Sequence, residues 1–370
     1  MHDALKLTTY AGERERHSGR PLADALIDVY GRHELRASVL LRGVEGFGAG
    51  QRLRTARMLS LSEDLPLVTV AVDSRDRMEP VVEEVAAIVS RGLITVERAR
   101  LLDGAGDTRG APSPGAAKLT VHIGRHERAG GRPAYLAIVE LLHRHGIAGA
   151  SVLLGVDGTL GGARRRGRFL ASNALVPMVV LSVGDASALD RVLPELSALL
   201  SHPLLTLESV QVCKRDGVLL AEPVEPPAGE EGGLGWWRKL SVYAGEQTHY
   251  DGEPLYSALV RRLRREGAAG ATVLRGLWGY HGEHPPHGEH PWSIRRRVPV
   301  VVTVIDTPAN ARRWFEVADA MTARAGLLTS ELVPALRAQA HGVQHGGLAL
   351  AGPVAAGDGA VPRPGPPQEP

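Results

Sequence analysis

The sequence predicts an α+β protein built from three tandem β-α-β-β-α-β units. Three segments open alike, at Lys6–Gly12, Lys118–Gly124 and Lys239–Gly245. Each is followed at matching spacing by a Gly two residues before a Pro, by two glycines three residues apart, and by a Pro that opens an aliphatic run. Matched positions at matched spacing are typical of internal repeats. We therefore expect three copies of one domain.

The elements of each copy follow in a fixed order. A short strand, such as Leu7–Tyr10, precedes a helix that carries a proline in its first turn, where a missing N–H costs nothing. The apolar face of this helix has the spacing i, i+3, i+4, i+7, and in the first copy it consists of Leu22, Ala25, Leu26 and Val29. The second strands are Val39–Leu41, Ser151–Leu153 and Thr272–Leu274. A long loop leads from each of them to the third strand.

The remaining elements complete the unit. The third strands are Leu67–Val72, Met178–Val183 and Val300–Ile305. The second helices are expected around Arg77–Ser90, Ala188–Leu200 and Ala309–Ala325, and the final strands begin at Leu93–Thr95, Leu204–Thr206 and Leu327–Thr329. The order β-α-β-β-α-β is that of the ferredoxin-like unit. Right-handed crossovers place both helices on one face of its four-stranded antiparallel sheet.

The other face of each sheet needs a partner, because the third strands are apolar on both faces. Three sheets packed around one axis bury three such faces, so we expect an intramolecular pseudo-trimer that is monomeric in solution. The domains are predicted at 1–104, 117–217 and 236–341, with linkers at 105–116 and 218–235. The Gly/Pro/Ala-rich tail at 342–370 has the composition of a disordered segment.

Composition excludes several classes of protein. The formal net charge is +2, which does not indicate a nucleic-acid binder. The single cysteine, Cys213, excludes a disulfide framework or a Cys-rich zinc site and suits a reducing cytosol. No apolar run is long enough for a membrane span, and the N-terminus does not have the pattern of a signal peptide. We therefore expect a cytoplasmic protein without membrane insertion.

The segment Arg42–Gly48 with Leu61–Pro66 resembles the P-II-like family catalogued as domain of unknown function 190. The Tyr10–Glu13 opening, the helix start at Gly19–Leu22 and the turn at Gly92–Thr95 support this resemblance, which extends over all three copies. Glu45–Gly48 also looks like the start of the long regulatory loop of nitrogen regulatory P-II proteins.

The resemblance implies a trimeric arrangement of ferredoxin-like domains with small anionic ligands, often adenine nucleotides, in clefts between units. It also implies that the long loops pass a signal to a partner such as a membrane transporter. The stretch Val89–Gly92 before the last strand lacks the glycines and lysine of the phosphate-cradling loop of classical P-II proteins. The second copy departs most, with Leu154 in place of Arg42 and Arg125 in place of Glu13, so its cleft is expected to be the weakest.

Arginines recur in and beside the long loops. Because guanidinium groups suit phosphate or carboxylate, they predict an anion site in each cleft, and the alternative is a solvated loop. The glycines either let backbone approach a ligand or supply special backbone conformations. The candidate ligand-binding residues are Arg42, Gly43, Gly46, Phe47, Gly48, Arg52, Arg54 and Arg57 in the first copy, and Arg275, Gly276, Gly279, Arg295, Arg296 and Arg297 in the third.

The third loop contains histidines at every third position. Imidazole is a common ligand of zinc, copper and nickel, so divalent-metal binding, as in trimeric cation-tolerance proteins, is the alternative function. A polar loop without metal is the other interpretation. The candidate ligands are His281, His284, His287 and His290.

An enzyme is disfavoured, because no positioned acid, base and nucleophile recur across the copies. The sequence thus favours a non-enzymatic ligand-sensing protein of the P-II-like type. In that reading a ligand orders the long loops and changes how a partner docks.

Overall fold

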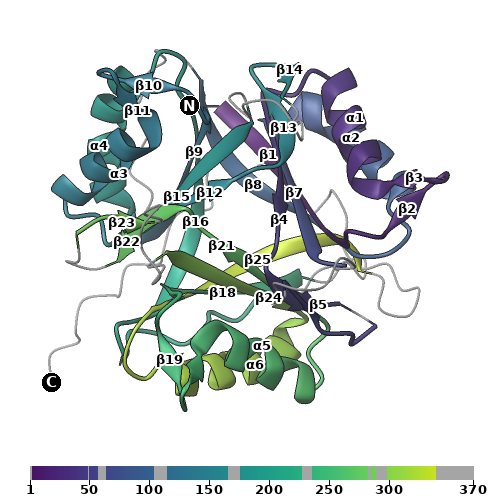
Figure 1. Cartoon of the computed structure of the whole chain (residues 1–370), viewed down its shortest axis with the longest axis vertical. Helices are drawn as coiled ribbons and strands as arrows, with labels where there is room; N and C mark the ends of the chain where they lie inside the picture. Colours follow the sequence, from purple (N-terminus) through teal and green to yellow (C-terminus); the bar gives the residue numbers. More distant parts are fainter. Residues whose placement is uncertain are drawn as a thin grey trace, which may run out of the picture.

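The computed structural model describes residues 2–48, 50–56, 64–103, 115–165, 176–226, 236–281, 285–288 and 298–338. Three α+β repeats surround a common centre, with the strands inside and a pair of helices on the outside of each repeat (Figure 1). The predicted element order recurs in each repeat. The segments outside the described residues include the tail at 342–370, most of the first linker and half of the second.

The bounds of the elements are as follows. The first repeat contains β1 (His2–Gly12), β2 (Arg16–His17), β3 (Arg20–Pro21), α1 (Leu22–Arg32), β4 (Ala37–Arg42), β5 (Glu45–Phe47), β6 (Arg54–Thr55), β7 (Pro66–Ser74), α2 (Arg75–Ile88) and β8 (Leu93–Asp103). The second contains β9 (Ala116–Gly124), β10 (Arg128–Ala129), β11 (Arg132–Pro133), α3 (Ala134–Arg144), β12 (Gly149–Leu154), β13 (Asp157–Leu160), β14 (Ala163–Arg164), β15 (Pro177–Asp185), α4 (Ala186–Leu199), β16 (Leu204–Arg215) and β17 (Val218–Leu219). The third contains β18 (Trp236–Gly245), β19 (His249–Tyr250), β20 (Glu253–Pro254), α5 (Leu255–Arg265), β21 (Ala271–Arg275), β22 (Trp278–His281), β23 (His287–Gly288), β24 (Pro299–Asp306), α6 (Pro308–Met321) and β25 (Leu327–Ala338).

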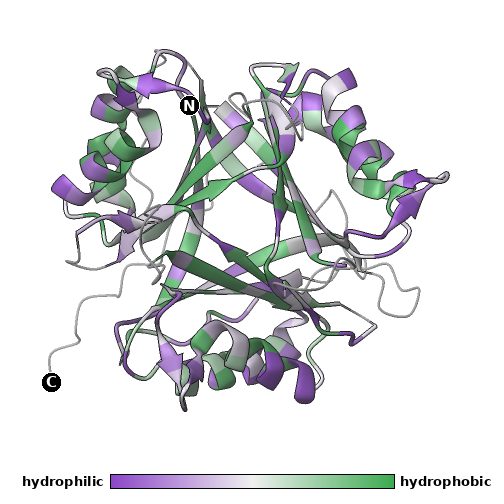
Figure 2. Ribbon diagram, viewed as in Figure 1, coloured by the Kyte–Doolittle hydropathy of each residue, from purple (hydrophilic) through white to green (hydrophobic). Residues whose placement is uncertain are grey.

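Each repeat forms a four-stranded antiparallel sheet with the same strand order. The orders are β4-β7-β1-β8, β12-β15-β9-β16 and β21-β24-β18-β25. The helix pair covers one face, and the helices turn their apolar sides to the strands and their polar sides outward (Figure 2). No helix within the described ranges has the length and apolar character needed to cross a membrane.

Several helix boundaries differ from the sequence prediction. The prolines Pro21, Pro133 and Pro254 precede the first helices as N-cap residues rather than lying in the first turn. The second helices begin one or two residues earlier than predicted. Helix α6 ends at Met321 and does not extend to Ala325, because the Thr322 hydroxyl donates to the Ala318 carbonyl at 2.7 Å and Gly326 follows with a φ of 106°.

The segment after each second strand is not only a loop, as the sequence predicts, but contains a strand that joins another repeat. Strand β5 pairs with β21 of the third repeat, β13 pairs with β4 of the first, and β22 pairs with β12 of the second. The three pairings form a closed cycle, so each second strand gains a neighbour from a different repeat. This pairing protects an edge that would otherwise be open to association.

The recurring glycine pairs make this pairing possible. A Cβ atom on Gly46 would lie 2.4 Å from the Ala271 carbonyl oxygen, and one on Gly279 would lie 2.1 Å from that of Ala150. Gly43 and Gly276 approach strand backbone of another repeat in the same way, at 3.1 and 3.0 Å. These four glycines therefore permit contact between repeats, and their recurrence needs no ligand.

The last strands close a second cycle. The start of β8 pairs with the end of β25, the start of β16 with the end of β8, and the start of β25 with the end of β16. Each final strand thus contacts both other repeats. The two cycles join the three sheets through backbone hydrogen bonds as well as through packing.

Three lysines and three glutamates meet where the repeats join. Each ammonium pairs with a carboxylate of its own repeat and with one of another repeat, and each of the six residues is at most 7% exposed. In five of these pairs the Nζ–O distance lies between 2.5 and 3.2 Å, and the sixth contact joins Lys6 to Glu208. We call this set the Lys/Glu ring; it consists of Lys6, Lys118, Lys239, Glu97, Glu208 and Glu331.

Candidate functional site

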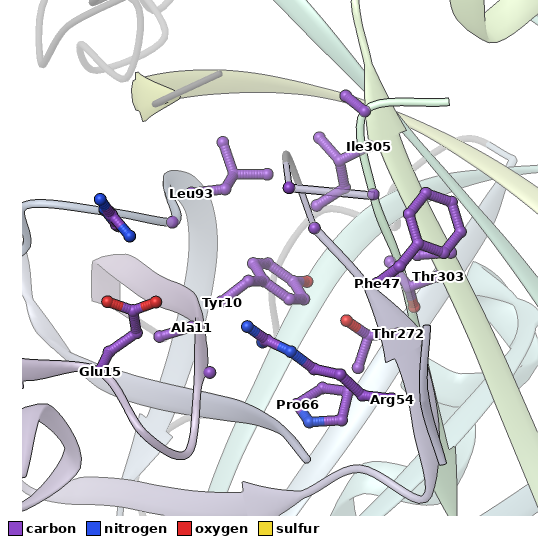
Figure 3. Close-up of a pocket in the computed structure, with 18 of the residues that line it drawn as sticks. Tyr10, Ala11, Glu15, Phe47, Arg54, Pro66, Leu93, Thr272, Thr303 and Ile305 are labelled. Atoms are coloured by element: carbon purple, nitrogen blue, oxygen red, sulfur yellow. The ribbon is translucent and has the colours of Figure 1, made fainter. Parts of the chain in front are cut away.

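A cleft of about 520 Å³ lies between the first and third repeats. The first repeat contributes the end of β1, the segment from β5 to β6 and the turn before β8. The third contributes β18, the start of β21 and β24. Figure 3 shows its labelled residues around one hollow. The lining consists of Tyr10, Ala11, Gly12, Glu15, Phe47, Gly48, Gly50, Arg52, Arg54, Pro66, Arg91, Gly92, Leu93, Trp237, Ala269, Gly270, Ala271, Thr272, Thr303 and Ile305.

One side of the cleft is apolar and partly aromatic. Tyr10 and Leu93 of the first repeat pack in one cluster with Trp237 and Ile305 of the third. Phe47 also lines the cleft and is 4% exposed. Flat apolar side chains of this kind suit an aromatic ring of a ligand, since ring pairs prefer stacked or edge-to-face contact.

Three arginines also line the cleft. Arg54 extends beside Pro66 towards Tyr10 (Figure 3). It pairs with Asp64 at 3.1 Å, and its Nε atom is buried without a hydrogen-bond partner in the described part of the chain. Arg52 and Arg91 also line the cleft and are exposed. Guanidinium groups offer paired donors to phosphate or carboxylate oxygens.

Two glycines shape the cleft around these arginines. The guanidinium of Arg54 packs over Gly12, where a Cβ atom would lie 2.4 Å from its nearest nitrogen. Gly92 has a φ of 120°, and a Cβ atom there would lie 2.3 Å from the Tyr10 carbonyl oxygen. A side chain at Gly92 is therefore excluded, and the turn that carries Arg91 approaches the end of β1 closely.

The predicted anion ligands at the loop bases lie elsewhere. Arg42 pairs with Glu13 and Arg275 pairs with Glu246, each at 2.9 Å and each within its own repeat. Neither arginine lines the cleft. In the second repeat both positions of this pair differ together, since Leu154 and Arg125 replace the arginine and the glutamate. The loop-base arginines are thus already neutralised within their own repeats.

The corresponding cleft between the third and second repeats is nearly filled, with about 50 Å³ of free space. Tyr280 takes the place that Phe47 has in the larger cleft. Its hydroxyl donates to the Ile147 carbonyl at 2.8 Å, and its ring meets His143 edge to face with centroids 4.9 Å apart. The ring therefore serves as core in this cleft and leaves little room for a ligand.

The loop of the second repeat holds its arginine in ion pairs. Arg164 pairs with Asp157 at 2.7 Å and also contacts Asp28 of the first repeat. The hydrogen bond to Asp157, with the charge of Asp28, raises the pKa of Arg164. Burial would raise the pKa of Asp28, but the hydrogen bond from Arg20 and the charge of Arg164 lower it. Arg164 thus links two repeats and is not available to an anion.

The histidines of the third loop are described only in part. His281 and His287 face each other across the β22–β23 hairpin, with ring centroids 6.4 Å apart. His287 Nδ1 lies 2.9 Å from the Pro285 carbonyl oxygen. The predicted site residues Arg57, His284, His290, Arg295, Arg296 and Arg297 lie outside the described residues.

Of the predicted residues, the structure brings Phe47, Gly48, Arg52 and Arg54 together in the large cleft. Sequence reasoning missed Arg91 and Glu15 as cleft residues. Trp237 packs in one cluster with Tyr10, Leu93 and Ile305 and also lines the cleft. The missed signal for Arg91 was its neighbour Gly92, which sits at the same place as Gly326 of the third repeat.

Comparisons with known proteins agree with the repeat pattern. Residues 4–101, 116–212 and 237–335 each match the family described as "DUF190: Uncharacterized ACR". A UPF0166 protein of Aquifex aeolicus is 31% identical over 77 residues, which cover 21% of this chain and 73% of that protein. A UPF0166 protein of Methanocaldococcus jannaschii is 32% identical over 77 residues, covering 20% and 68%.

Among solved structures, an aspartate kinase from Synechocystis aligns with a TM-score of 0.25 at 12% identity. The alignment covers 90% of this chain and 51% of the kinase chain, so this chain corresponds to about half of that length. A TM-score of 0.25 is too low to indicate a shared fold or activity.

Proposed function

The chain belongs to the DUF190 family in three tandem copies, and on that premise we propose that it is a non-enzymatic, P-II-like ligand-sensing protein. In this proposal the three ferredoxin-like repeats form an intramolecular pseudo-trimer, which is monomeric and cytoplasmic. The strand order of each sheet and the two cycles of strand pairing support it. So does the length of the relatives, since each alignment covers most of a relative but only about a fifth of this chain.

The ligand is a small anion with a flat apolar part, and an adenine nucleotide is the class that fits. The observation that carries this proposal is the cleft between the first and third repeats. It combines an aromatic side at Tyr10 and Trp237 with three arginines, and its volume of about 520 Å³ lies in the range of small-molecule sites. The cleft between the third and second repeats is nearly filled, and Arg164 of the second-repeat loop is held in ion pairs, so we propose one working cleft.

In this proposal the long loop of the first repeat, between β5 and β7, transmits the signal to a partner. Arg52 and Arg54 lie between β5 and the segment 57–63, so a ligand that contacts them and Arg91 ties this loop to the turn before β8. Such tethering favours one loop arrangement over others, which is how a ligand changes the docking of a partner. A regulated membrane transporter is the partner class that the resemblance to P-II proteins suggests.

Nucleotide titration tests the cleft. We expect ADP or ATP to bind the wild-type chain in isothermal calorimetry, and the double variant Arg52→Ala/Arg91→Ala to bind at least about 10-fold more weakly, because each lost bond from a charged donor costs about 1.5–3 kcal/mol. Arg165→Ala, in the corresponding loop of the second repeat, is the matched control and is expected to leave the affinity unchanged. Absence of binding to the wild type, or equal loss in the control, would contradict the proposed site.

Metal binding is the second candidate function, and the facing rings of His281 and His287 favour it. The Pro285 carbonyl holds a proton on His287 Nδ1, which leaves Nε2 as the ligand atom, an orientation found at metal sites. We expect His281→Asn/His287→Asn to abolish zinc or nickel uptake seen by calorimetry. His249→Asn, an exposed histidine in β19, is the control that retains it. Uptake that survives the double variant would remove this candidate.

A further inference from the structure

A second cavity, of about 100 Å³, lies where the three repeats meet. Tyr10, Thr272 and Thr303 line both this cavity and the cleft, but the arginines of the cleft do not line it. We call it the axial chamber. Its polar lining comes from the first strand of each repeat, and its apolar lining comes from the second and third strands. The polar residues are Lys6, Thr8, Tyr10, Lys118, Thr120, His122, Lys239, Ser241 and Tyr243, with Thr272 and Thr303 beside them.

The chamber is lined by hydrogen-bond donors in layers. Residues two apart on a strand face the same side, so each first strand presents a lysine, then a hydroxyl, then a ring. The lining includes the three lysines of the Lys/Glu ring and none of its glutamates. Of the charged side chains of the ring, only the lysines line the chamber, although the ring as a whole is neutral.

Among the described residues, each ammonium of the ring retains one N–H donor that no carboxylate accepts. An ammonium group carries three N–H donors, and each lysine of the ring is engaged with two carboxylates. The hydroxyls of Thr8 and Thr120 lie on the same face of their strands as these ammoniums. A cation in the chamber would face three positive charges, whereas an anion would accept hydrogen bonds from both layers.

His122 points independently to an occupant. It stands where the other two repeats have Tyr10 and Tyr243, and it is only 4% exposed. Its Nε2 atom is buried and has no hydrogen-bond partner among the described residues. Burial, together with Lys6, lowers the pKa of His122 to about 4, so the ring is neutral near pH 7. A buried polar atom without a partner costs free energy unless something in the chamber satisfies it.

We propose that the axial chamber binds a small inorganic anion of halide or nitrate size, held by the ring ammoniums, the Thr8, Thr120 and Ser241 hydroxyls and His122. The volume agrees with this class of ligand. One water needs about 10–15 Å³ measured in this way, so the chamber holds an ion with a few waters. A nucleotide needs a site of about 300 Å³ or more and is excluded.

Crystals grown or soaked in sodium bromide test the proposal, because bromide is located by its anomalous scattering. We expect a peak in the chamber within hydrogen-bond distance of at least one lysine Nζ. We expect it to disappear in His122→Phe, which keeps a ring but removes both nitrogens, and in Thr8→Val/Thr120→Val/Ser241→Ala. The triple variant preserves the shape of the two threonine side chains, so it still tests the anion site if His122→Phe does not fold.

Thr206→Val is the matched control. Thr206 is buried, does not line the chamber, and has a hydroxyl without a hydrogen-bond partner in the described ranges. Removal of this hydroxyl is therefore expected to leave the bromide peak in place. A bromide peak at Arg52, Arg54 or Arg91 would be evidence only about the cleft. The proposal for the chamber and the proposal for the cleft can therefore be tested separately. A wild-type chamber that holds only water, or a peak that persists in both chamber variants, would overturn the proposal.

Discussion

Replacing Lys239 with methionine is expected to lower the free energy of unfolding by about 3–5 kcal/mol, the range found when one partner of a buried ion pair is removed. Lys239 lies 2.5 Å from Glu97 and 3.0 Å from Glu331 and is 4% exposed. Its removal leaves two buried carboxylates with one fewer ammonium between them. Urea denaturation at pH 7 measures the loss.

Two further variants distinguish the contribution of the Lys/Glu ring to stability from that of an ordinary surface ion pair. Lys239→Met/Glu331→Gln restores neutrality and keeps a polar side chain, so it is expected to be more stable than Lys239→Met alone. Arg261→Met breaks the surface pair of Arg261 with Glu253, where both side chains are about half exposed, and is expected to cost at most about 1 kcal/mol. A single variant no more costly than this control would refute the ring as a stabilising contact.

The pH dependence of the unfolding free energy gives an independent test of the contribution of the Lys/Glu ring. Burial alone would raise the pKa of Glu97 and Glu331, but the neighbouring ammoniums outweigh it and both pKa values lie below the ordinary value. Their contribution is therefore present above the unfolded pKa of about 4.3 and is lost as the pH falls through the folded pKa. Lys118 behaves in the opposite way: burial opposes its charge, yet Glu208 and Glu331 raise its pKa, so its contribution is lost as the pH rises through that value.

The unfolding free energy of Lys239→Met is therefore expected to differ from that of the wild type by an amount that depends on pH. The carboxylates near the removed ammonium take up protons more readily, so the gap in stability between variant and wild type is expected to narrow as the pH falls from 7 towards about 4. Unfolding free energies measured across this interval give the gap directly. A gap that stays constant would indicate lost packing of the lysine stem rather than an unpaired charge.

Much of the fold was predictable from the sequence because the chain repeats itself. A single Lys-Leu-Thr opening proves little, but three copies with the same glycine and proline spacing define the units and their element order. Helix ends were less predictable, since alanines after Met321 suit a helix and only Thr322 and Gly326 end it. The pattern within one copy also carries no information about which repeat supplies the next strand, so the pairing of β5, β13 and β22 was missed.

The charged centre was missed for a related reason. Lys6, Lys118 and Lys239 served as markers of the repeat, although a lysine in an otherwise apolar strand calls for a buried partner. That partner was visible as a Thr-x-Glu pattern in each last strand, ending at Glu97, Glu208 and Glu331. Only the topology reveals that the two patterns meet. In the cleft, the clustering of arginines in the sequence identified Arg52 and Arg54. Arg91 was not predicted, because it lies in the turn before β8, outside the loop in which the arginines cluster.

Gly46→Ala is expected to destabilise the chain by about 3 kcal/mol, the upper end of the usual cost of overpacking. The added Cβ would lie 2.4 Å from the Ala271 carbonyl oxygen and 2.8 Å from Pro66 Cγ. The first of these atoms belongs to the backbone of another repeat, in a strand that is paired on both sides, so it has little freedom to move away. Denaturant unfolding with intrinsic tryptophan fluorescence measures the change.

The matched control lies two residues away. Gly48→Ala adds the same methyl group to the same segment, but no atom of the described residues lies within 4 Å of its Cβ position, so it is expected to change stability by less than about 0.5 kcal/mol. The clash at Gly46 acts on the pairing of β5 with β21, and loss of that pairing uncovers the β21 edge. An uncovered edge strand associates with other chains, so the Gly46 variant is also expected to form larger species on light scattering as its concentration rises. Equal behaviour of the two variants would mean that the glycine repeat serves something other than contact between repeats.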